Sequence, residues 1–169
     1  MAFDNPFAGE IWSSKYRFAP AGGGGDASLA ETWARVARAV SEPEAPDRRE
    51  AFRAEVMDAL TDCRFLPAGR ILAGAGTQRS VTLFNCFVMG EIPDDLGAIF
   101  EHVREAAVTL QQGGGVGMDF STVRPNGALV RGVGADASGP LSFMDVWDSM
   151  CRTILSAGQR RGAMMGCLR

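Results

Sequence analysis

The order of the predicted elements is the feature that most constrains the fold of this chain. Between residues 81 and 168, short apolar runs alternate with longer segments that carry apolar residues at helical spacing. Three such runs predict strands, at residues 81–89, 116–120 and 163–168, and a predicted helix lies in each interval between them. We expect the first of these strands to be buried. This order of strand, helix, strand, helix, strand is typical of an α/β fold.

The last predicted strand has no following partner in the chain, so the predicted sheet ends in an open edge. The unpaired N–H and C=O groups of such an edge invite pairing with a further strand. We therefore expect the chain to be the front of a larger protein.

The first part of the chain is predicted to be helical. Ser28 is a typical N-cap, and Glu31 follows it at the spacing of a capping box. A second helix is predicted to begin near Asp47, and the proline-bearing residues 43–46 would connect the two helices as an antiparallel pair. The apolar residues at helical spacing are Leu29, Trp33, Val36 and Val40 in the first helix and Phe52, Val56 and Leu60 in the second.

The second part of the chain carries start and stop signals for its helices. Asp94 or Asp95 would cap the first of them, and the glycines at 113–115 would end it. Pro140 marks the start of the second, and the intervening residues 121–139 are predicted to be a long loop. One apolar stripe of the first helix is predicted from Leu96, Ile99, Phe100, Val103, Ala107 and Leu110.

Charge and composition exclude several classes of function. The chain has 17 basic and 20 acidic residues, a net charge of −3, so a basic nucleic-acid-binding surface is not expected. No apolar run approaches the ~20 residues of a membrane helix, and the first residues lack a secretory signal, so we expect a cytoplasmic protein. Lys15 and His102 are the only residues of their types, which excludes a Walker A loop and a histidine-rich zinc site.

The four cysteines are Cys63, Cys86, Cys151 and Cys167, and they form no Cys-x-x-Cys pair. A zinc ribbon is therefore not expected, and no metal site is predicted. In a chain without a leader, free thiols are more common than structural disulfides. Cys86 lies in an apolar run beside Asn85, and on composition alone a buried structural cysteine is the favoured interpretation.

Several segments carry groups that bind anions or sugars. The glycines within 113–117 leave backbone N–H groups that could approach a phosphate or a ribose, although a tight turn would also explain them. Arg124 and Arg131 flank a glycine-bearing loop and could bind a polyphosphate, with two solvated surface arginines as the alternative. Asp94 could accept a bond from a sugar hydroxyl, and it could serve as an N-cap at the same time. Arg160, beside a second arginine and between glycines, belongs to a smaller candidate anion site.

Each of these signals is weak alone, but their order along the chain is distinctive. The motifs are FLPAGRILAGAGT at 65–77, FNCFV at 84–88, QQGGGVG at 111–117, DFST at 119–122, RP at 124–125, ASGPLSFM at 137–144 and SAGQRRGA at 156–163. This series strongly resembles the N-terminal part of the adenosylcobalamin (vitamin B12)-dependent, class II ribonucleotide reductases. The resemblance runs from about residue 5 to the last residue.

The resemblance implies a fold and an activity. The implied fold class is α/β, with an N-terminal helical segment at residues 1–64 and the first part of a ten-stranded α/β barrel at residues 65–169, incomplete in this chain. The implied activity is the reduction of ribonucleotides to deoxyribonucleotides for DNA synthesis and repair. The implied cofactor is adenosylcobalamin, on which the family's radical chemistry begins, and most of its site would lie outside this chain.

The resemblance also assigns roles to individual residues. Cys86 matches the first cysteine of the redox pair that supplies the reducing electrons and becomes a disulfide. Contacts with the substrate, largely through the backbone, are implied for Ala68, Gly69, Asn85 and Gly115, and Arg160 is implied to reach toward the substrate. Contacts with the specificity effector, a deoxynucleoside triphosphate or ATP, are implied for Asp94, Arg124, Arg131, Ser156 and Gln159.

The family's radical cysteine, second redox cysteine and active-site carboxylate match no residue of this chain, so the isolated chain is predicted to be inactive. The implied partners are the substrate, the effector, a thioredoxin-type reductant, and either the rest of the barrel as a separate chain or a second copy in a homodimer. Neither a nucleic acid nor a membrane is implied. The alternative is a non-catalytic nucleotide-binding protein derived from a reductase.

Overall fold

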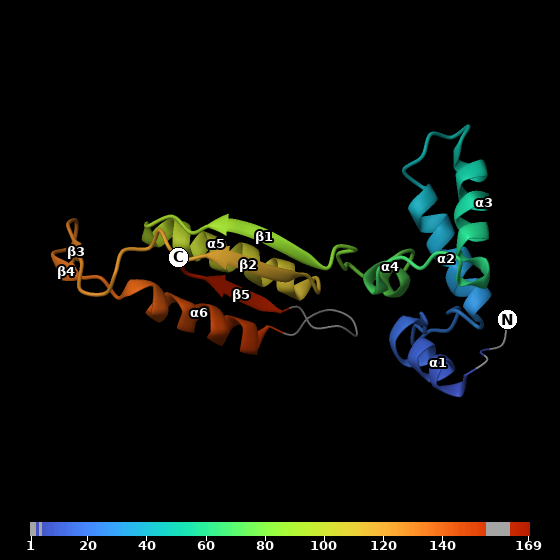
Figure 1. Ribbon diagram of the computed structural model, residues 1–169, viewed down its shortest axis with the longest axis horizontal. Coiled ribbons are helices and arrows are strands. Elements are labelled where there is room, and N and C mark those ends of the chain that lie inside the picture. The colour runs from blue at the N-terminus through green and yellow to red at the C-terminus, as the bar shows by residue number, and fades with distance from the viewer. Residues whose placement is uncertain (1–2, 4, 155–162) are drawn as a thin grey trace. The chain divides into compact units, whose positions relative to one another are not determined.

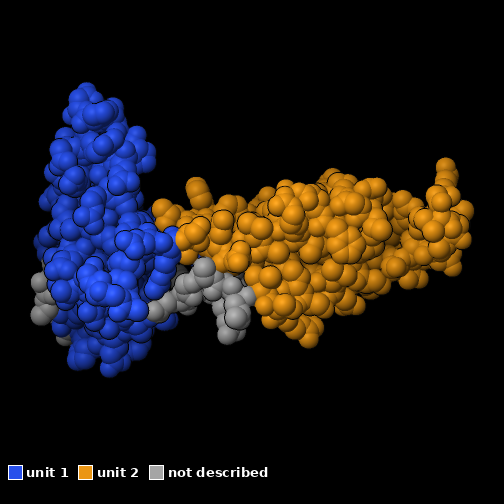
Figure 2. Space-filling view, turned by 180° about the vertical axis from the view of Figure 1, so that it is seen from behind, with its two compact units in different colours: residues 1–79 blue, residues 80–169 orange. Residues whose placement is uncertain are grey.

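The computed structural model describes residue 3, residues 5–154 and residues 163–169. They form two compact units, Met1–Arg79 and Ser80–Arg169 (Figure 2). The division falls after the boundary that we expected between residues 64 and 65, because a short helix beyond residue 65 packs with the helices before it. No helix among the residues described is long and apolar enough to cross a membrane.

The first unit is built from helices (Figure 1). They are α1 (Pro6–Ile11), the π-helical turn η1 (Trp12–Tyr16), α2 (Leu29–Ser41), α3 (Arg49–Leu60), the 3-10 turn η2 (Thr61–Cys63) and α4 (Gly69–Gly74). The predicted cap of α2 is confirmed, because Ser28 Oγ accepts a hydrogen bond from the Glu31 N–H at 3.3 Å. The Glu31 carboxylate accepts one from the Ala27 N–H at 2.8 Å, one residue before the N-cap. α2 and α3 lie side by side as the predicted antiparallel pair.

The core of the first unit lies between α2, α3 and α4. Leu60, the last residue of α3, is fully buried, which agrees with its place in the predicted stripe. The helices pack together through apolar side chains, so hydrophobic burial is the main force that holds this unit. The buried core residues are Leu29, Trp33, Val36, Leu60, Leu72 and Ala75.

A buried ion pair joins three parts of the first unit. Asp26 and Arg35 are each 4% exposed, and Arg35 Nη2 lies 2.9 Å from Asp26 Oδ2. Asp26 Oδ2 also accepts hydrogen bonds from the Phe18 N–H at 3.1 Å and from the Thr32 hydroxyl at 2.8 Å. The guanidinium group donates further to carbonyl oxygens at the end of α4, including that of Leu72 at 3.0 Å. The pair therefore ties the segment before α2 to α2 and to α4.

The ion pair predicts how the stability of the first unit depends on pH. Burial raises the pKa of Asp26, but hydrogen bonds from Arg35, Phe18 and Thr32 and the charge of Arg35 outweigh it and leave the pKa below its ordinary value of 3.8. A carboxyl group with a lowered folded-state pKa contributes stability that is fully present above the ordinary value and is lost as the pH falls through the lowered pKa. We expect Asp26→Asn to flatten the loss of stability between about pH 5 and about pH 2. Urea unfolding at each pH measures the free energy of unfolding of the unsubstituted chain and of the variant. An equal loss of stability in the two proteins on acidification would contradict the role given to the Asp26 carboxylate.

The second unit alternates strands and helices, as predicted. Its elements are β1 (Cys86–Glu91), α5 (Leu96–Gln111), β2 (Gly115–Asp119), β3 (Leu129–Val130), β4 (Ala135–Asp136), α6 (Gly139–Thr153) and β5 (Met164–Cys167). β1, β2 and β5 form a parallel sheet with β2 in the centre. β3 and β4 form a small antiparallel hairpin inside the segment predicted to be loop. The α/β class is therefore confirmed, and the loop prediction missed the hairpin.

α5 and α6 cover one face of the parallel sheet (Figure 1). Trp147 of α6 is fully buried and meets Phe120 edge-on, with 5.1 Å between the ring centroids. Each helix presents its apolar side to the sheet, so the sheet and the two helices share one core. The buried core residues are Ile92, Ile99, Ala106, Leu110, Val116, Met118, Phe120, Val123 and Trp147.

The opposite face of the sheet carries exposed side chains. Val88 is 95% exposed and Met165 is 66% exposed, and Cys86 and Cys167 are exposed thiols. The register sets Val88 beside Gly117 and Gly117 beside Met165, and alternate residues of a strand point to the same side. Cys86, Val88, Met165 and Cys167 therefore share one face, which we call the open face.

The prediction of a buried strand at residues 81–89 is wrong in two respects. The strand begins at Cys86, and its first residues alternate between exposed and half-buried. A continuous apolar run predicts burial on both faces of a strand. Here Phe87 and Met89 are half-buried, whereas Val88 lies on the open face.

The apolar stripe predicted on α5 is only partly correct. Ile99 and Leu110 are buried, and Ala106 is buried with them. Leu96 and Phe100 are 63% and 50% exposed. A helix that packs on a sheet buries one side, and these two residues lie beside that side rather than on it.

Candidate functional site

Three residues of the predicted substrate site come together at the start of β1 and β2. Cys86 pairs in register with Gly115, and the Gly115 N–H donates to the Asn85 carbonyl oxygen at 2.8 Å. A Cβ placed on Gly115 would lie 3.2 Å from Cys86 Sγ and 3.2 Å from the Ala163 carbonyl oxygen. Such contacts are tighter than a side chain normally makes, so a glycine here leaves room beside the thiol.

Cys86 is an exposed free thiol, and the interpretation of it as a buried structural cysteine is therefore wrong. Cys63 and Cys167 are also exposed free thiols, whereas Cys151 is partly buried. Burial, and then the negative charge of Asp148, raise the pKa of the Cys151 thiol. The raised pKa leaves less of Cys151 as thiolate, so this thiol is less reactive than a cysteine with the ordinary pKa.

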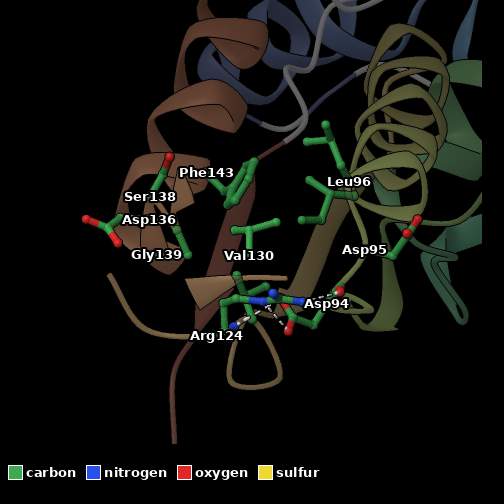
Figure 3. Close-up of a pocket in the computed structure, with 12 residues that line it drawn as sticks. Asp94, Asp95, Leu96, Arg124, Val130, Asp136, Ser138, Gly139 and Phe143 are labelled. Carbon is green, nitrogen blue, oxygen red and sulfur yellow. Dashed lines mark hydrogen bonds and ion pairs between the residues drawn. The ribbon is translucent and has the colours of Figure 1, made fainter. Parts of the chain in front are cut away.

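A second cluster of predicted residues borders a cavity of about 330 Å³ in the second unit (Figure 3). The residues before α5, the β3–β4 hairpin and the start of α6 surround it. Its apolar wall is formed by Ile99, Val123, Val130 and Phe143. A concave site with an apolar wall and a few polar groups is typical of a small-molecule site.

Asp94 and Arg124 form an ion pair at this cavity, and Asp95 and Asp136 add two further carboxylates to its lining. Arg124 Nε donates to Asp94 Oδ2 at 2.8 Å, and the Arg124 backbone N–H donates to Asp94 Oδ1 at 3.2 Å (Figure 3). Their side chains are 34% and 33% exposed, so the pair is only partly screened by water. Asp95, not Asp94, is the N-cap of α5, because Asp95 Oδ1 accepts the Ala98 N–H at 2.9 Å. The N-cap interpretation of Asp94 is therefore wrong, whereas Arg124 is a partly exposed arginine that is ion-paired.

The other predicted effector residues are not brought to this cavity by the described part of the structure. Arg131 is exposed in the turn between β3 and β4 and does not line the cavity. Ser156 and Gln159 lie outside the described residues, as does Arg160, which is predicted to contact the substrate.

Ala68 and Gly69, two of the predicted substrate residues, belong to the first unit. Ala68 is the N-cap of α4 without a side-chain hydrogen bond, and Gly69 is the first residue of that helix. Their backbone groups therefore lie at a helix start, where N–H groups have no partner within the helix. Cys86, in contrast, belongs to the second unit.

Sequence reasoning missed Asp136 and Ser138, which line the cavity from the end of β4 and the residue before α6. The glycine at position 139 was a sequence signal for a tight turn at this place. In the structure its φ is +81°, and a Cβ added to it would lie 2.7 Å from the backbone nitrogen of Asn126. A residue in that conformation and at that distance has to be glycine, so the chain turns tightly into α6. Among the residues described, no three His, Cys, Asp or Glu side chains gather as a metal site would need.

Comparison with known proteins covers both units. Residues 2–80 match the family model of the ribonucleotide reductase all-alpha domain, and residues 84–169 match that of the ribonucleotide reductase barrel domain. The break between the two matches falls beside the boundary of the two compact units.

Individual relatives agree with the family models. The vitamin B12-dependent ribonucleoside-diphosphate reductase of Mycobacterium tuberculosis (strain H37Rv) is 35% identical over 140 residues, which are 83% of this chain and 20% of the relative. The corresponding protein of Thermoplasma acidophilum is 40% identical over 114 residues, 68% of this chain and 14% of the relative. The ribonucleoside-diphosphate reductase subunit alpha of Chlamydia pneumoniae is 26% identical over 132 residues, 78% of this chain and 12% of the relative.

The chain thus spans a fifth or less of the length of these relatives. The two family models together cover nearly all of it, in the order helical domain and then barrel domain. The parallel sheet with helices on one face lies in the residues that match the barrel-domain model. The chain therefore belongs to the ribonucleotide reductase family, as its motifs predicted.

Proposed function

We propose that the chain is the N-terminal part of a B12-dependent ribonucleotide reductase, which reduces ribonucleotides to deoxyribonucleotides by radical chemistry. The observation that carries the proposal is the exposed Cys86 thiol beside Gly115 on the open face of the parallel sheet. A reducing thiol needs access to its substrate, and a buried core cysteine would not have it. The isolated chain would be inactive, because the other two cysteines and the carboxylate of the reaction match none of its residues.

Cys86 would supply one of the two thiols that reduce the ribose. The C2′–O bond of the ribonucleotide breaks, a C2′–H bond forms, and the hydroxyl group leaves as water. The two thiols give up two electrons and two protons and become a disulfide, which a thioredoxin-type reductant returns to thiols. The second thiol would come from a cysteine outside these residues.

The substrate contacts are proposed at two places. Asn85 and Gly115 flank Cys86 and would offer backbone groups to the ribonucleotide. Ala68 and Gly69 would do the same from the start of α4. Arg160 is proposed as a further substrate contact on the resemblance alone. A ribonucleoside diphosphate is the substrate that the names of the relatives indicate.

Adenosylcobalamin is proposed as the cofactor of the whole reductase, in which it would start the radical chemistry. The open face, as far as the described residues show it, does not enclose a group as large as a corrin, since Val88 on this face is 95% exposed.

The cavity beside Asp94 and Arg124 is proposed as the site of the specificity effector, a deoxynucleoside triphosphate or ATP. The guanidinium group of Arg124 suits a phosphate, the carboxylate of Asp94 suits a sugar hydroxyl, and the apolar wall suits a base. Arg131, Ser156 and Gln159 are proposed to complete the site on the resemblance alone.

Removing the Arg124 side chain should weaken binding of a deoxynucleoside triphosphate to this chain about tenfold, because one charge-assisted contact is lost. Isothermal titration calorimetry with the chain and its Arg124→Ala variant measures the change. Arg104→Ala is the matched control, since Arg104 forms a similar exposed ion pair with Glu101 on α5. Equal weakening by both substitutions would refute the assignment of the cavity.

The larger architecture is part of the same proposal. The sheet would be the start of a ten-stranded barrel, and the helical segment would end at residue 64, with α4 counted as barrel. The protein would be cytoplasmic and act as a homodimer or with the rest of the barrel as a separate chain. The alternative is a non-catalytic nucleotide-binding protein. The cavity beside Asp94 and Arg124 is the one observation that favours it, because residues of this chain alone line that cavity and could bind a nucleotide without the rest of a reductase.

One experiment separates the two functions. The chain alone, incubated with adenosylcobalamin, a ribonucleoside diphosphate and a dithiol, should form no deoxyribonucleotide. The reductase that contains these residues should form it under the same conditions. Effector binding without turnover by every form of the protein would favour the non-catalytic alternative, and turnover by the chain alone would contradict the proposal.

A further inference from the structure

The helix α4 depends on a neighbour for its position. It has six residues, and isolated helices shorter than ~12 residues are marginal in water. Its N-cap, Ala68, has no side chain that could bond the first N–H groups, and Leu72 is its one buried residue. Local sequence therefore contributes little to holding it.

Arg35 of α2 supplies the anchor. Its guanidinium group donates to the Leu72 carbonyl oxygen at 3.0 Å through Nη2 and to the Ala75 carbonyl oxygen through Nη1. The last carbonyl groups of a helix have no partner within it, and a cation there also opposes the helix dipole. The chain then passes closely over Arg35, because a Cβ on Gly76, where φ is +71°, would lie 2.9 Å from Arg35 Cγ.

Arg35 is itself held in one orientation. Asp26 accepts hydrogen bonds from Arg35 Nε at 3.1 and 3.2 Å and from Nη2 at 2.9 Å, a two-pronged contact that fixes the plane of the guanidinium group. Thr32 donates to the same carboxylate at 2.8 Å, and the Trp12 indole N–H donates to the Thr32 hydroxyl oxygen at 3.0 Å. The anchor is thus preorganised by three side chains, those of Asp26, Thr32 and Trp12.

We infer that Arg35 is a positioning residue for the substrate: it fixes the end of α4, and thereby the start of that helix, where Ala68 and Gly69 would contact the ribonucleotide. This inference rests on the proposed function. Arg35 would not touch the substrate itself, because it is 4% exposed and its N–H groups donate to Asp26 and to the carbonyl groups of Tyr16, Leu72 and Ala75.

The substitution that tests it is Arg35→Lys. A lysine keeps the positive charge beside Asp26, but its single ammonium group cannot replace the planar fork that reaches Asp26 and two carbonyl oxygens together. Arg38→Lys is the matched control, because Arg38 is an exposed arginine of the same helix. Hydrogen exchange of the 169-residue chain and steady-state kinetics of the reductase that contains it are measured for both variants.

Arg35→Lys should accelerate amide exchange in α4 and leave α2 and α3 protected, and it should raise the KM for the ribonucleotide about tenfold with kcat and effector binding nearly unchanged. Arg38→Lys should change neither. An unchanged KM, or a uniform loss of protection in α2, α3 and α4, would overturn the inference. If the unsubstituted reductase made no deoxyribonucleotide, the proposed function would fail, while the exchange data would still decide whether Arg35 holds α4.

Discussion

Cys86→Ser should abolish multiple-turnover formation of deoxyribonucleotide in the reductase that contains this chain. A hydroxyl group cannot give up electrons to form a disulfide, so the reducing step has no electron source. Serine is nearly the size of cysteine, and the site beside Gly115 on the open face has room for it. The fold and the binding of nucleotides should therefore persist, and deoxyribonucleotide yield measured over many turnovers is the readout.

Cys167→Ser is the control for this prediction. Cys167 is also an exposed free thiol, and it lies on the same open face in β5. The proposed function gives it no redox role, so this variant should keep most of the activity. Near-normal turnover by Cys86→Ser, or equal losses from the two substitutions, would show that Cys86 is not the reducing thiol.

Trp147→Ala should destabilise the second unit by about 3–5 kcal/mol, the range for removing a large aromatic side chain from a core. The indole is fully buried between α6 and the sheet, and its edge-on contact with Phe120 is lost in the variant. Urea unfolding followed by circular dichroism measures the change.

Leu141→Ala, on the same helix, separates burial from helix propensity. Leu141 is 68% exposed, so its truncation should change the free energy of unfolding by no more than about 0.5 kcal/mol. A loss as large as that from Trp147→Ala would mean that α6 is not packed on the sheet as described.

Signals that involve only neighbouring residues were sufficient to predict most of the elements. Ser28 and Glu31 marked the start of α2, and the glycines from Gly113, where φ is +88°, marked the end of α5. Pro140 lies in the first turn of α6, as its missing N–H favours. These effects act within one turn of chain, so they can be read without knowledge of the tertiary structure.

Contacts between distant residues could not be predicted in this way. Adjacent aspartates made Asp94 and Asp95 equal candidates for the cap; in the structure Asp95 accepts the Ala98 N–H, and Asp94 instead contacts Arg124, 30 residues away. The pairing of Asp26 with Arg35 likewise has no local signature, because either residue alone is a typical surface charge. The order of motifs, rather than any one residue, pointed to Cys86.

The state of the Cys86 thiol after a single turnover tests most directly whether Cys86 is one of the two reducing thiols. The reductase, with no external reductant, is mixed with excess ribonucleotide, quenched, alkylated and analysed by mass spectrometry. One disulfide that contains Cys86 should form for each deoxyribonucleotide produced, since two thiols supply the two electrons. Deoxyribonucleotide formed in equal amount while Cys86 remains a free, alkylated thiol would contradict the account.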